Sequence, residues 1–364
     1  MRNARTFVGL LALHLIAGCV SAGGGGAGGV EETGQQSQAQ TRVWPVLTRS
    51  HVDLWLHGYA MLLVDTARVP VFRKGYRDRV QAEKNQRGVT TLLDANRERL
   101  QSRLALSAAL FNGQFAPMYF ASFEQMRQVI DLFLRAEGTP GATNDPTLRQ
   151  FFAVLASSFQ SAADRDWLRV FTESLEDERR QFYQQYWTSE HAGRLGYVRR
   201  VDSLWQNTYR PKLQGFLNNT QQENGEMILA LTLGGEGRTV NFSSRQNAVA
   251  TTMPEADPLE ALYVFAHEIV NSIVGTAVND NTTPNEQRSG LSARYVTTGT
   301  VRAGAMLLRR TAPELLAGYT RYYLSQAGQP ATGDIDARLA TVFALPQNIV
   351  DAIDRQLQVV LGGI

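Results

Sequence analysis

The sequence predicts a mainly α-helical protein with one small antiparallel β-sheet, an α+β fold. Three observations lead to this prediction. Before residue 220, apolar residues recur at helical spacing in segment after segment. Between Met227 and Thr252 the pattern changes to short apolar and alternating runs, which are typical of strands. From Asp257 to the end of the chain the helical spacing returns.

Length and composition set the domain organisation. The chain has 364 residues, of which 43% are hydrophobic and 19% charged, enough for one large globular domain or two smaller ones. The sequence divides into a signal peptide (1–18), a flexible tether (19–43), a helical region (44–220) and an α+β region (221–364).

The first residues have the features of a bacterial secretory signal. Arg2 and Arg5 precede an apolar run from residue 7 to residue 17, too short to span a membrane as a stable helix. The run ends in Leu-Ile-Ala-Gly-Cys at residues 15–19, which resembles the lipobox of bacterial lipoproteins. The resemblance implies acylation of Cys19, the only cysteine, by palmitate-like chains after the signal is cut. An ordinary signal peptide cut nearby is the alternative.

The segment behind Cys19 is rich in glycine, serine, alanine and glutamine, and it predicts a tether that cannot bury a core. Val20 stands where aspartate would signal retention in the inner membrane, so the lipoprotein resemblance implies the outer membrane of the cell envelope. Once residues 1–18 are removed, the 36 Lys and Arg lose Arg2 and Arg5, and the remaining 34 equal the 34 Asp and Glu. A balanced charge predicts no nucleic-acid partner.

Residues 44–220 predict a series of helices. The segments expected to be helical are 48–66, 76–110 as one or two helices, 121–136, 146–162, 164–187 and 189–218 with a kink before Pro211. Acids and bases alternate with apolar residues in 164–187, which predicts an amphipathic helix with a solvated charged side. His51 and His57 are six residues apart, off one helical face, and predict packing or surface roles.

Strands are expected at 227–233, 238–242 and 248–252, joined by tight turns such as Gly234-Gly235-Glu236-Gly237. A helix should follow at once, because Asp257 can cap it and Pro258 suits its first turn. Apolar residues cover most of this helix, as in a helix buried in a domain interior. Further helices are expected at 292–310, at 313–326 and from Pro346 onward.

The buried helix carries His267-Glu268-Ile269-Val270-Asn271, close to the H-E-x-x-H pattern, in which two histidines bind Zn²⁺ and the glutamate activates water. The order of the elements resembles that of a zincin metallopeptidase of the gluzincin kind: helices, a small sheet, a helix that carries His-Glu, and then another helix. The resemblance implies His267 and the Asn271 position as metal ligands and Glu268 as the catalytic carboxylate. Asn271 is a poor zinc ligand beside an imidazole, so the motif is incomplete.

Gluzincins take a third ligand, a glutamate, from the next helix. The segment that resembles this part of the family is Thr297 to Ala303, with Gly299 at the glutamate position. Glu286 and Glu314 are the candidate displaced ligands.

Three hypotheses remain open. The C-terminal region is a zincin-like domain without catalysis, needing no cofactor; or an atypical zinc-dependent peptidase or hydrolase; or part of an unrelated helical envelope lipoprotein. Expected partners are the membrane, through lipid on Cys19, and an envelope protein or peptide.

Overall fold

The fold is mostly helical with one small sheet, as the sequence predicts. A computed structural model describes residues 43–63, 67–242 and 246–362. The predicted signal peptide, the predicted lipidation site Cys19 and all but the last residue of the predicted tether lie outside these residues. The described chain belongs to one compact unit, Arg42–Ile364.

The sheet has four strands in the order β1-β2-β4-β3: β1 (Val46–Thr48), β2 (Asn224–Ala230), β3 (Arg238–Asn241) and β4 (Gln246–Thr252). The expectation of an antiparallel sheet is correct only for β3 and β4. Strands β1, β2 and β4 are parallel, because the chain leaves β2, turns back as β3 on the outer edge, and returns as β4 between the two. The sheet is therefore mixed. Strand β1, from the N-terminal region, ties that region to the other three strands.

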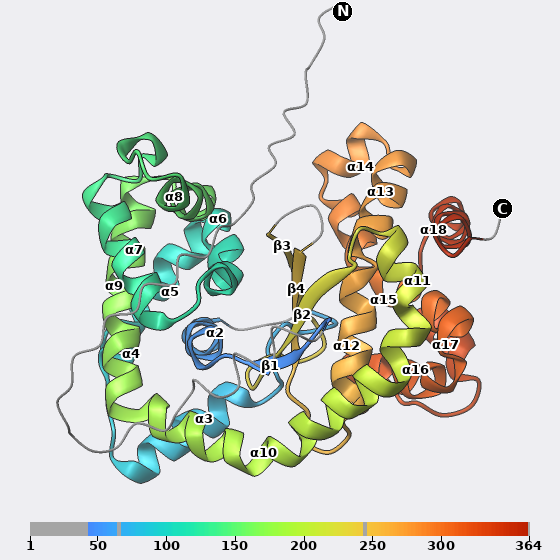
Figure 1. The fold of residues 1–364 in the computed structure, drawn as a ribbon, viewed down its shortest axis with the longest axis horizontal. Helices are drawn as coiled ribbons and strands as arrows, with labels where there is room; N and C mark the ends of the chain where they lie inside the picture. The colour runs from blue at the N-terminus through green and yellow to red at the C-terminus, as the bar shows by residue number, and fades with distance from the viewer. Residues whose placement is uncertain (1–42, 64–66, 243–245, 363–364) are drawn as a thin grey trace, which may run out of the picture. The chain divides into compact units, whose positions relative to one another are not determined.

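Two hydrophobic cores lie on opposite faces of the sheet. Side chains alternate along β2, so Met227 and Leu229 join the core of the C-terminal helices, while Ile228 and Ala230 join the core of the N-terminal helices. Figure 1 shows the corresponding helices on either side of the strands.

The N-terminal layer contains short and medium helices with clear start signals. Ser122 caps α7, Asp145 caps α8 ahead of Pro146, and Ser161 forms a capping box with Asp164 at the start of α9. The predicted helix or pair over 76–110 is divided into four, since turns interrupt it. The bounds are α2 (Ser50–Leu62), α3 (Tyr76–Arg87), α4 (Leu92–Ala95), α5 (Arg97–Leu106), α6 (Ala108–Asn112), a 3₁₀ segment (Gly113–Tyr119), α7 (Phe123–Arg135), a 3₁₀ turn (Pro140–Ala142), α8 (Pro146–Ser158) and α9 (Ala162–Glu178).

One continuous helical run connects the two layers. Helix α9 passes through a π-helical segment (Arg179–Tyr183) into α10 (Gln184–Leu204), and a second π segment (Trp205–Tyr209) leads into α11 (Arg210–Asn219). In Figure 1 this run changes direction between α9 and α10 and again between α10 and α11. Extra residues in a turn are an established cause of helix bends. The second π segment accounts for the kink that the sequence predicts before Pro211.

The C-terminal layer packs around α12 (Leu259–Ile269), whose residues from Ala261 to Ile269 are all buried. Asp257 accepts a hydrogen bond from the Leu259 amide, as expected of a capping residue. The predicted loop over 279–285 is mostly helical. The remaining helices are α13 (Asn271–Asn281), α14 (Pro284–Arg288), α15 (Leu291–Thr311), α16 (Pro313–Gln326), α17 (Ile335–Val342) and α18 (Gln347–Val360).

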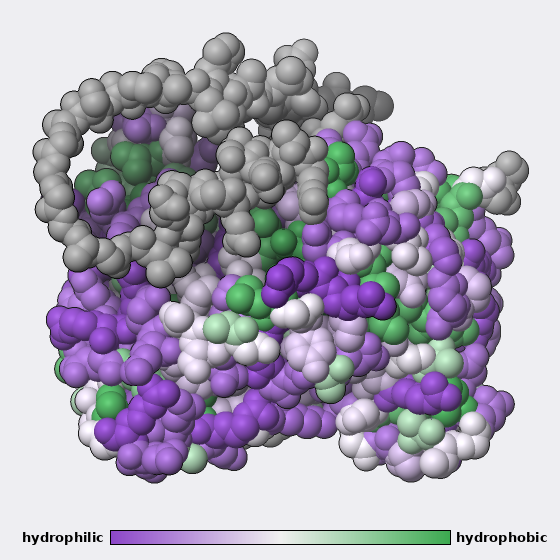
Figure 2. All heavy atoms as spheres, turned by 60° about the horizontal axis from the view of Figure 1, so that its bottom comes forward, coloured by the Kyte–Doolittle hydropathy of each residue, from purple (hydrophilic) through white to green (hydrophobic). Residues whose placement is uncertain are grey.

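Among the described residues, one segment, Leu259–Asn281, is long and apolar enough to cross a membrane. Its most apolar window is 78% buried inside the protein, and a buried core helix meets the same length and hydropathy criteria. The face turned forward in Figure 2 is mainly hydrophilic, with small separate hydrophobic areas. Scattered exposed apolar residues of this kind are ordinary on a protein surface.

Candidate functional site

The His-Glu pair lies at the end of α12, against the sheet edge and α15. Both residues are 3% exposed, as the apolar sequence around them predicts. The helix does not continue regularly through the motif, because Val270 has φ −90° and ψ −3° and separates α12 from α13. Asn271 therefore begins a new helix.

Glu268 accepts three hydrogen bonds from within the chain. Its Oε1 accepts from His267 Nδ1 at 2.9 Å and from the Gly237 amide at 3.0 Å, and its Oε2 accepts from Asn271 Nδ2 at 2.9 Å. Glycine is required at 237, since a Cβ there would lie 1.9 Å from the Ala250 oxygen. Burial alone would raise the pKa of Glu268, but the hydrogen bond and charge of His267 and the Gly237 amide outweigh it, and the pKa is lowered.

Asn271 uses both ends of its amide. The nitrogen donates to Glu268, and the oxygen accepts from Thr300 Oγ1 of α15 at 3.1 Å. The Glu268 main-chain oxygen also accepts from Thr239 of β3. We refer to His267, Glu268, Asn271, Thr300 and Gly237 as the His-Glu clamp, because their hydrogen bonds connect α12 to α13, α15 and the chain entering β3.

The imidazole of His267 stacks on Tyr323 of α16, with ring centroids 5.2 Å apart and planes inclined by 17°. The Tyr323 hydroxyl donates to the Gly235 oxygen. His267 Nε2 is buried and has no hydrogen-bond partner among the described residues. One nitrogen of His267 is thus engaged by Glu268 and the other faces a packed interior.

The residues present do not fit the zinc site that the motif implies. A ligand must offer a lone pair, but Asn271 directs its N–H group to Glu268 and its oxygen to Thr300. Within the described ranges, no three His, Cys, Asp or Glu side chains lie close enough to share a metal ion. Zinc sites need three or four such ligands.

The residues considered for a third ligand lie elsewhere. A Cβ at Gly299 would meet Val274, Ile353 and Leu345, so this position faces α13 and α18. Thr300, one residue on, is the position that faces Asn271. Glu286 closes the capping box of α14 with Thr283, and Glu314 pairs with Lys212.

No family model, curated protein or solved structure matches this chain. The resemblance to zincins therefore rests on the order of the elements and on His267-Glu268.

A second His-Glu pair, which the sequence does not reveal, lies in the N-terminal layer. His57 Nε2 of α2 is 3.1 Å from Glu178 Oε1 at the end of α9, and Lys84 Nζ of α3 is 2.8 Å from Glu178 Oε2. Lys84 also contacts Asp94 Oδ2 at 2.6 Å and Thr91 Oγ1 at 3.1 Å. We refer to these five residues as the N-terminal ion cluster.

The side chains of His57, Lys84 and Glu178 are fully buried. Burial alone would raise the pKa of Glu178, but the His57 hydrogen bond and the nearby charge of Lys84 lower it to about 2. The prediction of a solvated charged side for 164–187 is therefore wrong at Glu178. An acid inside an alternating charge pattern gives no signal of burial, because its partners lie 94 and 121 residues away.

Asp53 of α2 is also a buried carboxyl group, but its hydrogen-bond donors are neutral. It accepts hydrogen bonds from Trp187 Nε1 at 2.9 Å and from the Leu231 amide at 2.7 Å. Burial raises its pKa to about 7, because these neutral donors offset only part of the desolvation. Of the two roles predicted for His51 and His57, packing or surface, burial of both residues supports packing.

Proposed function

We propose that this protein is a lipid-anchored lipoprotein of the bacterial envelope whose zincin-like C-terminal region serves as a binding scaffold and not as a peptidase. One observation carries the proposal. Every oxygen of the Glu268 carboxylate and both ends of the Asn271 amide are engaged in hydrogen bonds within the chain.

A glutamate that acts on a metal-bound water needs a free oxygen and a metal beside it. Here the Glu268 oxygens are held by the Gly237 amide, His267 and Asn271, in a site where 3% of the side chain is exposed. Release of the carboxylate would leave these buried donors without acceptors, at a cost of about 1–3 kcal/mol each. The arrangement favours a fixed structural role for Glu268.

Support for the anchor comes from the sequence at residues 15–19 and from the glycine-rich segment that follows. Several acyl chains on Cys19 would give stable attachment, since a single chain binds membranes only weakly. The tether would then leave the folded unit free to meet an envelope partner.

Metal analysis of the purified full-length protein tests the proposal that the C-terminal region is not a zinc peptidase. We expect far less than one zinc per chain, with no change in His267→Ala. Stoichiometric zinc that disappears in His267→Ala would favour the atypical hydrolase.

A double variant tests the resemblance to zincins. Asn271→His together with Thr300→Glu supplies the two missing ligands and should create zinc binding if the resemblance is correct, with Asn271→His alone as the control. Failure of the pair to bind zinc would favour an unrelated helical lipoprotein.

Cell fractionation and mass spectrometry test the anchor. Wild-type protein should be found in the outer membrane with acyl chains on Cys19, and Cys19→Ser should be released from the membrane fraction. An unmodified mature N-terminus at another residue would contradict the anchor.

A further inference from the structure

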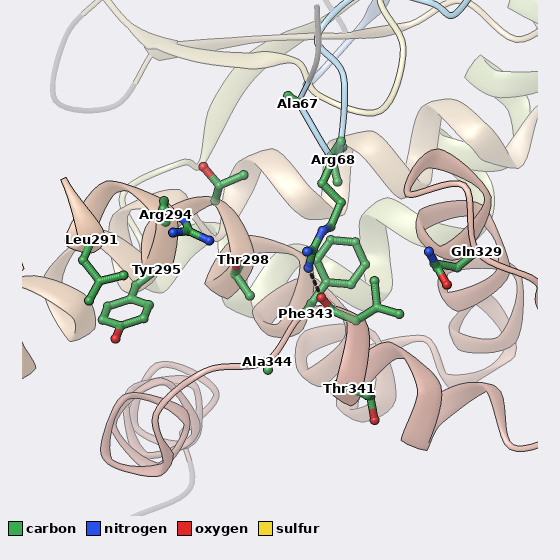
Figure 3. Close-up of a pocket in the computed structure, with 13 residues that line it drawn as sticks. Ala67, Arg68, Leu291, Arg294, Tyr295, Thr298, Gln329, Thr341, Phe343 and Ala344 are labelled. Carbon is green, nitrogen blue, oxygen red and sulfur yellow. Dashed lines mark hydrogen bonds between the residues drawn. The ribbon is translucent and has the colours of Figure 1, made fainter.

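A cavity of about 730 Å³ lies away from the His-Glu clamp, with which it shares no residue. Its walls come from four parts of the chain: residues 67–69, the first half of α15, Gln329 after α16, and residues 341–344 at the end of α17 (Figure 3). Sites for small organic molecules commonly have volumes of this size and both apolar and polar walls.

The charge on the cavity walls is of one sign. Arg68 and Arg294 line it, and the described lining residues include no aspartate or glutamate. The side chain of Arg294 forms no hydrogen bond or ion pair with any residue that the structure describes. Arg68 donates to the Val342 main-chain oxygen and lies 6.0 Å from the centre of the Phe343 ring.

A third guanidinium lies behind the same wall. Arg302 of α15 is half-buried and donates to the main-chain oxygens of Ala340 and Phe343. Burial and the charge of Arg309 lower the pKa of Arg302. Two arginines on the cavity wall and a third behind it, with carbonyl oxygens as the partners of Arg68 and Arg302, favour an anion.

The remaining walls define the rest of the ligand. Leu291 and Tyr295 are partly exposed side chains on the same stretch of α15 as Arg294, and Thr298 adds a hydroxyl group. Figure 3 shows the guanidinium of Arg68 next to Phe343 and that of Arg294 on the side of Thr298. An acidic head group can therefore contact the arginines while an apolar body lies on Leu291 and Tyr295.

From this geometry we infer that the cavity binds a small organic anion, with a carboxylate or phosphate head group on Arg68 and Arg294 and a short apolar body against Leu291 and Tyr295. Guanidinium groups recognise both head groups through paired hydrogen bonds. The inference goes beyond the proposed function, since it holds whether or not the His-Glu clamp is catalytic.

The test uses the full-length protein and three soluble probes, hexanoate, hexyl phosphate and 1-hexanol, with binding followed by ligand-observed NMR and isothermal titration calorimetry. At least one of the two anions should bind saturably, and at least tenfold more tightly than the alcohol, because the alcohol lacks the charge that the arginines recognise. Tighter hexanoate identifies a carboxylate ligand, and tighter hexyl phosphate identifies a phosphate ligand. Equal binding of alcohol and anions, or no saturable binding of either anion, would overturn the inference.

Variants locate the binding. Arg294→Gln should weaken the anion about tenfold without loss of fold, because Arg294 makes no contact that the fold needs. Arg68→Gln should weaken it similarly, with circular dichroism to confirm that the variant is folded. Arg200→Gln, an exposed arginine of α10, is the matched control and should bind as wild type does. Unchanged affinity in Arg294→Gln would place the anion elsewhere and overturn the inference.

Discussion

The two layers of this protein each contain a buried His-Glu pair, and the two pairs differ in what surrounds them. In the N-terminal ion cluster, Glu178 faces Lys84, a buried cation, as well as His57. In the His-Glu clamp, Glu268 faces His267 and two amide donors, Gly237 and Asn271. Each glutamate pairs with a histidine, but Glu178 also faces a buried lysine, whereas Glu268 is held in addition by two directed amide donors.

The difference shows how a motif can mislead. His267 and Glu268 are neighbours in the sequence and fit a known pattern, whereas His57 and Glu178 are 121 residues apart and fit none. Yet both glutamates have a lowered pKa despite burial. A buried carboxylate needs hydrogen-bond donors or cations around it whether or not it is catalytic, so a lowered pKa does not by itself indicate an active site. Four experiments can separate the two kinds of site.

The largest effect is expected from Lys84→Met. The substitution leaves Glu178 and Asp94 without their buried cation, which typically costs about 3–5 kcal/mol. Urea denaturation would measure the loss. Arg87→Met on the same helix removes an exposed cation and should cost under about 1 kcal/mol. A double variant that also carries Glu178→Met should recover part of the stability, and a loss of less than 1 kcal/mol in Lys84→Met would contradict the ionic account.

The contributions of Asp53 and Glu178 to the free energy of unfolding should change with pH in opposite directions. The pKa of Asp53 is raised from 3.8 to about 7, so its stability contribution is complete below pH 3.8 and declines as the pH rises to about 7. The decline is on the order of 4 kcal/mol at most. The pKa of Glu178 is lowered from 4.5 to about 2, so its contribution is complete above pH 4.5 and is lost as the pH falls toward 2.

Denaturation of wild type and Asp53→Asn between pH 4 and pH 8 would measure the first of these slopes. The variant should lack the decline, since an amide does not titrate in this range. Parallel curves for the two proteins would show that Asp53 does not titrate there.

A moderate effect is expected from Glu268→Gln. The amide keeps the size of the side chain but places an N–H group against one of three donors, which should cost about 1–3 kcal/mol. Thermal denaturation gives the value, and Glu260→Gln at the partly exposed start of α12 is the control. A neutral result would mean that Glu268 is not held as described. In a catalytic site, by contrast, removal of a strained carboxylate often stabilises the protein.

The smallest effect is expected from Thr300→Val. Loss of the hydroxyl leaves the Asn271 oxygen without its donor and should cost about 1 kcal/mol. Thr297→Val, on the exposed side of the same helix, should stay within about 0.5 kcal/mol of wild type. If both variants behave alike in chemical denaturation, Thr300 does not hold Asn271 in place.

Features that neighbouring residues decide can be predicted from the sequence, and features that distant residues decide cannot. The burial of α12, its start after Asp257, the presence of strands β2, β3 and β4 and the bend before Pro211 follow from local residue order, and the structure confirms them. The short strand β1 was not predicted. Local order could not give the parallel pairing of β1, β2 and β4, since Val46 and Met227 meet only when 180 intervening residues have folded.

The candidate site divides in the same way. Residue order was enough to predict that His267 and Glu268 lie on a buried helix and that Asn271 interrupts the zinc motif. Only the folded chain shows that Asn271 binds Glu268 and Thr300, that Gly299 faces Val274, and that Glu178 is buried beside Lys84. The physical reason is that residue order fixes the period and the termini of an element, whereas the partner of a buried polar group is chosen by whichever distant donor the packing brings within about 3 Å.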